Sequence, residues 1–212
     1  MRLLSVLTGR PEPVEAKSGR TGFFKRPRTG PVRIAAGGLA GDHIVDTQHH
    51  GGPDQAVYLM GSGDYAHWEQ ALGRPLAPGA FGENLVIEGW TSASAAIGDR
   101  IVIGNCALEL TAPRVPCVTL ARVMGDRGFA KRFFAEAHPG AYARVLTEGD
   151  VCAGDRARVD PYRQGPRITM AACLQGTADG FRDPALLANL LRVPAHHVLA
   201  RMAFDALDKG EA

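Results

Sequence analysis

Long apolar runs are the first feature that this sequence of 212 residues lacks. A membrane-spanning helix needs ~18 or more continuous apolar residues, and no stretch of the chain provides them. The opening MRLLSVLTGR has too short an apolar run for a signal peptide. With 45% hydrophobic and 22% charged residues, the chain does not belong to the disordered class. We therefore expect a globular protein of the cytoplasm.

The signatures of several enzyme and metal-site classes are missing as well. GxxxxGK[ST], a GxGxxG after a strand and GxSxG do not occur, so nucleotide hydrolysis, Rossmann dinucleotide binding and serine hydrolysis lack their usual motifs. The four cysteines form no CxxC pair, which leaves zinc ribbons and iron–sulfur sets without support. In a cytosolic chain we expect no disulfide framework.

Glycine and proline, by contrast, are abundant, with 26 and 14 residues scattered without a period. This composition disfavours a helix bundle and suits short strands joined by tight turns. Short runs of β-forming residues recur between Gly, Pro, Asp and Asn. The strands that we predict from them are residues 3–7, 32–35, 56–60, 85–87, 100–103, 107–111, 143–146 and 156–159.

Helical periodicity is rarer and becomes dominant only near the C-terminal end. Residues 62–72 and 128–137 place aromatic side chains at spacings of three and four. After Pro161 the same spacing returns in three short stretches, residues 169–178, 184–191 and 194–207. We therefore predict one domain over residues 1–162 and a helical extension over residues 163–212.

The net charge is only +2, but it is unevenly distributed. Residues 1–34 hold eight basic and two acidic residues, whereas residues 35–100 hold two basic and eight acidic ones. A phosphate-binding rim, nucleic-acid binding and internal charge pairing all agree with this pattern. Nucleic acid is the least favoured, because only Phe23 and Phe24 supply aromatic rings within the basic segment.

The backbone before Cys117 is stiff, because Pro113 and Pro116 flank Arg114 just ahead of it. A nearby guanidinium favours the thiolate form, which is a nucleophile and a ligand for soft metals. The alternative is a buried thiol that acts as a small hydrophobic side chain. The other three cysteines, Cys106, Cys152 and Cys173, lack such neighbours, and we interpret them as packing residues.

A second polar cluster lies within thirteen residues and contains Asp42, His43, Asp46, His49, His50 and Asp54. These residue types could hold zinc or iron, but no HExxH or similar spacing occurs. Gly51 and Gly52 instead suggest a backbone with positive φ or a close approach to a ligand. We favour a polar turn with one functional histidine over a metal cage. Glu83 and Asn84 either cap a turn or bind a ligand, and the sequence does not separate these roles.

Five segments taken together resemble the MOSC family, which is named for the C-terminal domain of molybdenum cofactor sulfurases. They are TGFFKRP, then GLAGDHIVD followed by HHGGPDQAVYLM, FGENL, IGD and LELTAPRVPC. Their order and spacing are similar to those of the stand-alone bacterial, YiiM-type members. The resemblance runs from Leu3 to about Met202. It implies a mainly β fold: a partly closed, mostly antiparallel β-barrel with decorating helices and a C-terminal three-helix extension.

The resemblance also implies a cofactor and a set of site residues. Cys117 matches the family cysteine that carries sulfur or ligates the molybdenum of a bound molybdopterin (the molybdenum cofactor). Proton delivery falls to His50, Glu83 or Asp54, and His49 is an extra histidine, so either of the two adjacent rings could face the pocket. The residues that the resemblance places at the cofactor are Thr21, Lys25, Arg26, Asp42, Gly51, Gly52, Asn84 and Arg114. We predict that these segments converge on one cleft.

The activity that the resemblance implies is the reduction of N-hydroxylated compounds, such as hydroxylaminopurines, to amines. No flavin or iron–sulfur motif occurs in the chain, so the implied partners are a small N-hydroxylated substrate and an external electron-donor reductase. We expect no membrane partner and no pyridoxal phosphate, and a homodimer is left open. The alternative is a module that holds a persulfide or the cofactor on Cys117 without turnover. A structural or nucleic-acid-binding domain is the third interpretation.

Overall fold

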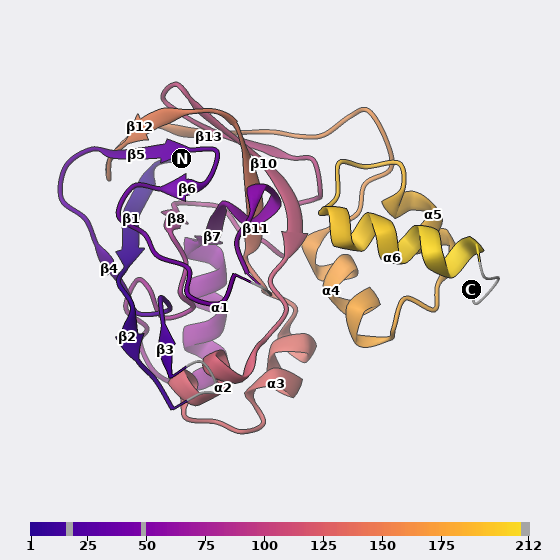
Figure 1. Cartoon of the computed structure of the whole chain (residues 1–212), viewed down its shortest axis with the longest axis horizontal. Coiled ribbons are helices and arrows are strands. Elements are labelled where there is room, and N and C mark those ends of the chain that lie inside the picture. Colours follow the sequence, from indigo (N-terminus) through magenta and orange to yellow (C-terminus); the bar gives the residue numbers. More distant parts are fainter. Residues whose placement is uncertain (16–18, 48–49, 209–212) are drawn as a thin grey trace.

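An eight-stranded sheet forms the centre of the molecule in the computed structural model, which describes residues 1–15, 19–47 and 50–208 (Figure 1). The strand order is β13-β9-β10-β11-β7-β8-β1-β4. All neighbouring strands are antiparallel except β7 and β8, which run parallel. The strands are β1 (Leu3–Gly9), β4 (Lys25–Pro27), β7 (Val57–Gly61), β8 (Leu85–Ile87), β9 (Arg100–Ile103), β10 (Cys106–Pro113), β11 (Ala141–Thr147) and β13 (Ala157–Asp160).

Two smaller sheets lie beside it. One has the order β12-β5-β6, from β5 (Val32–Ala35), β6 (Gly38–Leu39) and β12 (Gly149–Val151), and the other pairs β2 (Glu12–Pro13) with β3 (Arg20–Thr21). The predicted strands are thus present, with ends that differ by a few residues.

The prediction of a partly closed barrel is not confirmed. Among the described residues no continuous ladder joins the first and last strands of the sheet order. A single bridge, Arg2 to Arg156, connects the start of β1 to the start of β13. Three backbone hydrogen bonds flank this bridge, including one from Gly154 N to the carbonyl of Leu3 at 2.7 Å, and Gly154 adopts φ +99° in the adjoining turn. With its six α-helices, the described chain is a mixed α/β fold and not a mainly β one.

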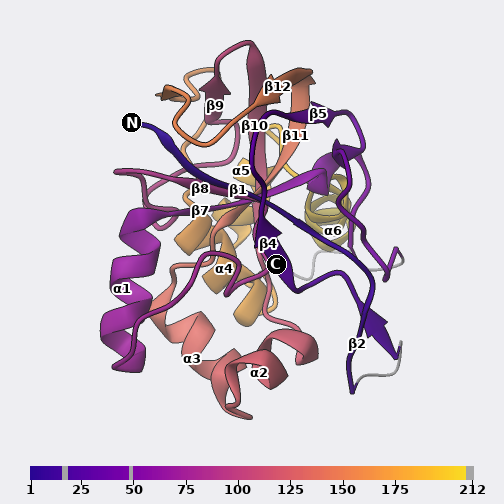
Figure 2. The ribbon, with the colours of Figure 1, turned by 90° about the vertical axis from the view of Figure 1, so that its left-hand side faces the viewer.

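The helices form two groups at different sides of the sheet. In Figure 2, α1 (Ser62–Leu72), α2 (Val118–Met124) and α3 (Phe129–Glu136) lie at the end of the molecule opposite β9 and β12. In Figure 1, α4 (Met170–Ala178), α5 (Pro184–Leu190) and α6 (His197–Asp208) lie beside β10 and β11. Helix α2 was not predicted, and no described helix has the length and apolar character to cross a bilayer.

The aromatic faces predicted for residues 62–72 and 128–137 pack against each other. The ring of Trp68 stacks on Phe133 at 5.4 Å and also contacts Phe129 at 5.3 Å, and all three side chains are fully buried. Gln175 Nε2 donates to the carbonyl of Phe134, which joins α4 to α3. The buried cluster around Trp68, Phe129 and Phe133 anchors α2 and α3, and thereby the segment that carries Cys117.

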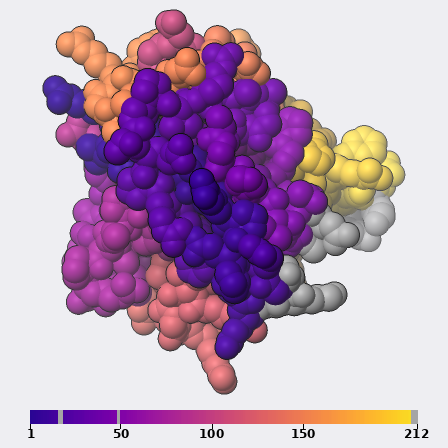
Figure 3. Space-filling model, turned by 60° about the vertical axis from the view of Figure 1, so that its left-hand side comes forward, coloured from indigo at the N-terminus to yellow at the C-terminus, as the bar shows by residue number. Residues whose placement is uncertain are grey.

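The main core is shared by the sheet and the C-terminal helices. Leu187, Leu190 and Leu199 belong to the same buried cluster as Leu108 and Leu110 of β10. The last strand ends at Asp160 and the next helix begins at Met170. The division at residue 162 stays a prediction, since the two parts bury one common core. In Figure 3 the N-terminal part of the chain runs through the middle of the visible face, and the C-terminal residues lie at its right-hand edge.

Candidate functional site

Cys117 is the residue just before helix α2, in the short segment that links α2 to the end of strand β10 at Pro113. Its backbone is extended (φ −114°, ψ 168°), as usual for the residue that precedes a helix. The thiol therefore lies at the positive end of the helix, which favours an anionic group. The side chain is half-buried, so a ligand can reach the sulfur.

The surroundings of Cys117 stabilise its thiolate. Burial on its own raises the pKa of this thiol, but a hydrogen bond with His50, the charge of Arg114 and the Leu120 amide lower the pKa to about 6. Arg114 Nη2 lies 3.7 Å from Cys117 Sγ. By contrast, burial raises the pKa of Cys106 to about 11 and that of Cys173 to about 12. Cys117 is thus largely ionised at neutral pH, and these two buried thiols are not.

Arg114 is a buried cation that lacks a carboxylate partner within the described chain. Its guanidinium carbon lies 5.4 Å from the ring centre of Phe23 and 5.1 Å from that of Tyr58, so cation–π contacts hold it in place. Its Nε is the one buried side-chain nitrogen or oxygen of the described residues without a hydrogen-bond partner. An orphaned donor of this kind is costly unless a ligand completes it.

A second buried cation, Lys25, lies close enough to Arg114 to feel its charge. Burial is the main cause that lowers the pKa of Lys25, Asp42 raises it, and Arg114 lowers it further. Lys25 Nζ forms an ion pair with Asp42 Oδ2, and both side chains are more than nine-tenths buried. Asn84 Nδ2 donates to the same oxygen at 2.8 Å, while Gly9 N donates to Asp42 Oδ1 at 2.7 Å.

Glu83 directly precedes Asn84 in the chain, and its side chain is fully buried. Its carboxylate accepts from the Tyr65 hydroxyl, from Gly79 N at 2.5 Å and from Phe81 N at 3.1 Å. Burial is the largest influence on Glu83 and raises its pKa. These bonds fix the turn that precedes Asn84. Gly79 is required in this turn, because a Cβ there would lie 2.5 Å from the carbonyl oxygen of Lys25.

The glycine pair borders a cavity next to His50. Gly51 and Gly52 have φ of +83° and +80°, which other residues rarely adopt. The cavity has a volume of about 400 Å³, and Asp42, His50 and Gly38 also line it. His50 therefore reaches both the cavity and Cys117, whereas His49 lies outside the described residues.

Three of the predicted site residues have other surroundings. Arg26 is 69% exposed and pairs with Glu12. Asp54 pairs with Arg144 and with His197 of the C-terminal helices. Thr21 Oγ1 accepts from Phe23 N at 3.1 Å and shapes the turn before Lys25. The structure thus brings Cys117, His50, Arg114, Lys25, Asp42, Asn84 and the glycine pair together.

Two tyrosines of the site were missed at the sequence level. The rings of Tyr58 and Tyr142 have centres 5.1 Å apart. Burial raises the pKa of both tyrosines, and the nearby charge of Arg114 lowers it by a smaller amount. The Tyr58 hydroxyl donates to the carbonyl of Pro139 at 2.8 Å. Both lie in ordinary β-forming runs, so residue type alone carried no signal. Only the pairing of β7 with β11 brings them together.

The MOSC domain model matches residues 46–158, which is more than half of the chain. The chain is also 37% identical over 154 residues to the uncharacterized protein YflK of Bacillus subtilis, covering 72% of this chain and 70% of that one. This chain belongs to the MOSC domain family.

Further relatives cover less of their own length. A protein of Gibberella moniliformis named "Reductase" is 34% identical over 140 residues, which are 63% of this chain and 24% of that protein. YiiM of Escherichia coli is 33% identical over 95 residues, 43% of this chain and 42% of that one. The crystal structure of YiiM from Geobacillus stearothermophilus superposes with a TM-score of 0.78 at 24% identity, covering 97% and 98% of the two chains. At that identity the superposition shows that the fold is shared.

Proposed function

We propose that this chain binds the molybdenum cofactor at Cys117 and reduces N-hydroxylated compounds to amines. The observation that carries the proposal is the pair formed by the Cys117 thiolate and the buried Arg114, whose Nε has no partner. MOSC domains are associated with the molybdenum cofactor, and one relative is named a reductase. The substrate and the ligation of molybdenum by Cys117 belong to the proposal alone.

The residues present fit an anionic, thiolate-bound group. Thiolates are soft ligands that suit molybdenum chemistry. Arg114 offers an unused N–H donor, and guanidinium groups bind phosphate and pterin-type acceptors through such donors. Lys25 adds a second buried cation, which is paired with Asp42 and lies close enough to Arg114 to feel its charge. We assign Cys117 to the metal, and Arg114 and Lys25 to the anionic part of the cofactor.

Reduction of R–NHOH to R–NH₂ and water consumes two electrons and two protons. When bound, the cofactor supplies the electron pair and accepts the oxygen, which is chemistry that no side chain of this site provides. The chain's own part is to bind, to orient and to deliver protons. His50 is the group in position for proton delivery, because its ring meets both Cys117 and the cavity. Asp54 and Arg26 have no place in this proposal.

Glu83 is assigned to positioning. Three donors already occupy its carboxylate, and its side chain is fully buried. It holds the turn that delivers Asn84 to Asp42 and so keeps Lys25 in place. The electrons come from an external reductase in this proposal, and the cavity of about 400 Å³ receives the small substrate.

A second candidate is a module that carries sulfur or the cofactor without turnover. The half-buried thiolate at a helix start favours it, because a persulfide on Cys117 would be stabilised by the same charges.

The test is to express the protein in a host that makes molybdopterin, and to measure bound molybdenum and the reduction of a hydroxylaminopurine with a chemical electron donor. We expect molybdenum and turnover in the wild type, loss of both in Cys117→Ser, and retention of both in the matched control Cys152→Ser. Molybdenum without turnover would favour the carrier module. A wild type that contains no molybdenum would overturn the cofactor assignment.

A further inference from the structure

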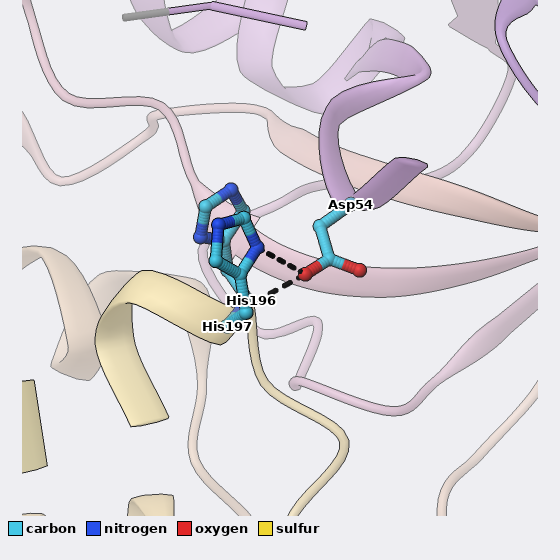
Figure 4. Close-up of side chains that lie close together, drawn as sticks. All are labelled: Asp54, His196 and His197. Atoms are coloured by element: carbon cyan, nitrogen blue, oxygen red, sulfur yellow. Dashed lines mark hydrogen bonds and ion pairs between the residues drawn. The ribbon is translucent and has the colours of Figure 1, made fainter. Parts of the chain in front are cut away.

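Asp54, His196 and His197 form a polar cluster where the segment around Asp54 meets the C-terminal helices. Asp54 lies in the short 3-10 helix η1 (Pro53–Gln55); His196 directly precedes α6, and His197 is its first residue. Figure 4 shows the carboxylate of Asp54 pointing toward the two imidazole rings. One ligand atom from each residue lies within 4.8 Å of the other two.

We propose that Asp54, His196 and His197 bind a divalent transition-metal ion at a site separate from Cys117. Two imidazole nitrogens and one carboxylate oxygen form a donor set that zinc, iron, cobalt and nickel accept. Asp54 Oδ2 and His197 Nδ1 lie 2.8 Å apart, and the two rings stack with centres 4.4 Å apart at an angle of 25°. Water fills the remaining positions, because the His197 side chain is 71% exposed.

Two partners hold the carboxylate of Asp54 in place. Arg144 Nε and Nη2 contact Asp54 Oδ1 at 2.9 and 2.8 Å. Oδ2 faces the rings and accepts from His197 N at 2.9 Å, which leaves its second lone pair for an ion in place of His197 Nδ1. Arg144 is itself bound by Glu109 at 3.3 Å and by the carbonyl of Ala195 at 3.0 Å. Partners of this kind orient the ligands of a metal and are part of its binding energy.

The histidines are also held by their backbone. His196 N donates to the carbonyl of Thr111 at 2.9 Å, and the Thr111 hydroxyl donates to the carbonyl of Asp54 at 2.6 Å. β10 thus anchors both sides of the cluster, and the ligands need no large movement to meet an ion.

Binding exchanges two hydrogen bonds for metal bonds. The ion replaces the hydrogen bond between His197 Nδ1 and Asp54 Oδ2, and the ring proton moves to the exposed Nε2. His196 Nδ1 gives up the bond that it accepts from Val198 N at 3.1 Å. The charge of Arg144 opposes a dication, so we expect weaker binding than at a closed four-ligand zinc site. The ion would tie η1 to α6 and raise the melting temperature.

The test is titration of the metal-free protein with Zn²⁺ by calorimetry and with Co²⁺ by visible absorption. Both are run in the wild type and in Cys117→Ser, so that ions held by the thiolate are separated from ions held by this cluster. We expect one Zn²⁺ per chain that persists in Cys117→Ser and raises its melting temperature.

Substitutions then locate the ion. In the Cys117→Ser background we expect His197→Ala and Asp54→Asn each to weaken Zn²⁺ binding at least tenfold. His67→Ala is the matched control, because His67 also pairs with a carboxylate, Glu136 at 2.7 Å, and should leave binding unchanged. His197 is exposed, so its variant is expected to fold, which circular dichroism checks. No Zn²⁺ binding in Cys117→Ser, or equal binding in His197→Ala, would overturn the proposal and leave the cluster as a hydrogen-bonded link between η1 and α6.

Discussion

Arg114 directly follows strand β10 and Arg144 lies within its partner strand β11, but the two side chains differ in how the protein balances their charge. Arg144 is bound by Asp54, Glu109 and the Ala195 carbonyl. Arg114 is more deeply buried, stacks on two aromatic rings and keeps an unpartnered Nε. A cation that the protein itself neutralises serves to hold elements together. A buried cation whose neighbouring anion is a thiolate, and whose Nε has no partner, indicates a place for a ligand. From this contrast we expect Arg144 to be structural and Arg114 to bind the ligand of the proposed site.

The largest effect expected from this contrast is on stability. Arg144→Met leaves the carboxylates of Asp54 and Glu109 partly buried without their shared partner. Breaking such a pair costs several kcal/mol when it is fully buried; since the Arg144 side chain is 25% exposed, we expect a loss of about 2 kcal/mol in unfolding free energy.

Arg114→Met is the matched variant. It removes a buried charge that has no carboxylate partner, so we expect the unfolding free energy to stay within about 1 kcal/mol of the wild type. Urea denaturation of the two variants measures both values. Equal losses would show that Arg114 is as structural as Arg144, and the contrast would then fail.

The next effect concerns the pH dependence of Cys117 reactivity. The thiolate is the reactive form, and the pKa of Cys117 is about 6. The rate of alkylation by iodoacetamide should therefore be high and nearly constant above pH 7, and should fall about tenfold per pH unit well below pH 6. Mass spectrometry of the Cys117 peptide follows the rate.

Arg114→Met sharpens this prediction. Removal of the guanidinium withdraws one of the influences that lower the pKa of Cys117, so the midpoint should move to higher pH. Arg144→Met should leave the midpoint where it is. A midpoint near pH 8.5 in the wild type would mean that the thiol is unperturbed and that the site lacks its proposed electrostatics.

The smallest effect is expected at Arg26. Its side chain is exposed and its ion pair with Glu12 lies on the surface, so Arg26→Ala should change neither stability nor bound molybdenum measurably. Lys25→Met, one residue earlier, should lower the molybdenum content. Metal analysis of both variants from a molybdopterin-producing host decides between them. A loss of molybdenum in Arg26→Ala would restore it as a cofactor contact, as the family resemblance predicted.

Local residue pattern was enough to predict most elements of this chain. Alternating apolar residues between turn residues predicted the strands, and the aromatic spacings predicted α1 and α3. Helix α2 was missed because its seven residues, VTLARVM, carry no clear periodicity and no capping side chain. Barrel closure was also beyond the local pattern, since it depends on whether the two ends of the sheet meet.

The motifs, with their order and their reactive residue types, predicted the family and predicted Cys117, Arg114 and Lys25 as site residues, while they left open which of His49 and His50 faces the pocket. Only the tertiary structure decided which way each side chain faces. Lys25 and Arg26 are neighbours in β4, where consecutive side chains point to opposite faces, so one is buried and the other exposed. His50 and Asp54 are four residues apart, yet two positive-φ glycines and η1 intervene, and the chain turns one toward Cys117 and the other toward α6. A sequence motif states which groups are available, but backbone direction and distant packing partners determine where they act.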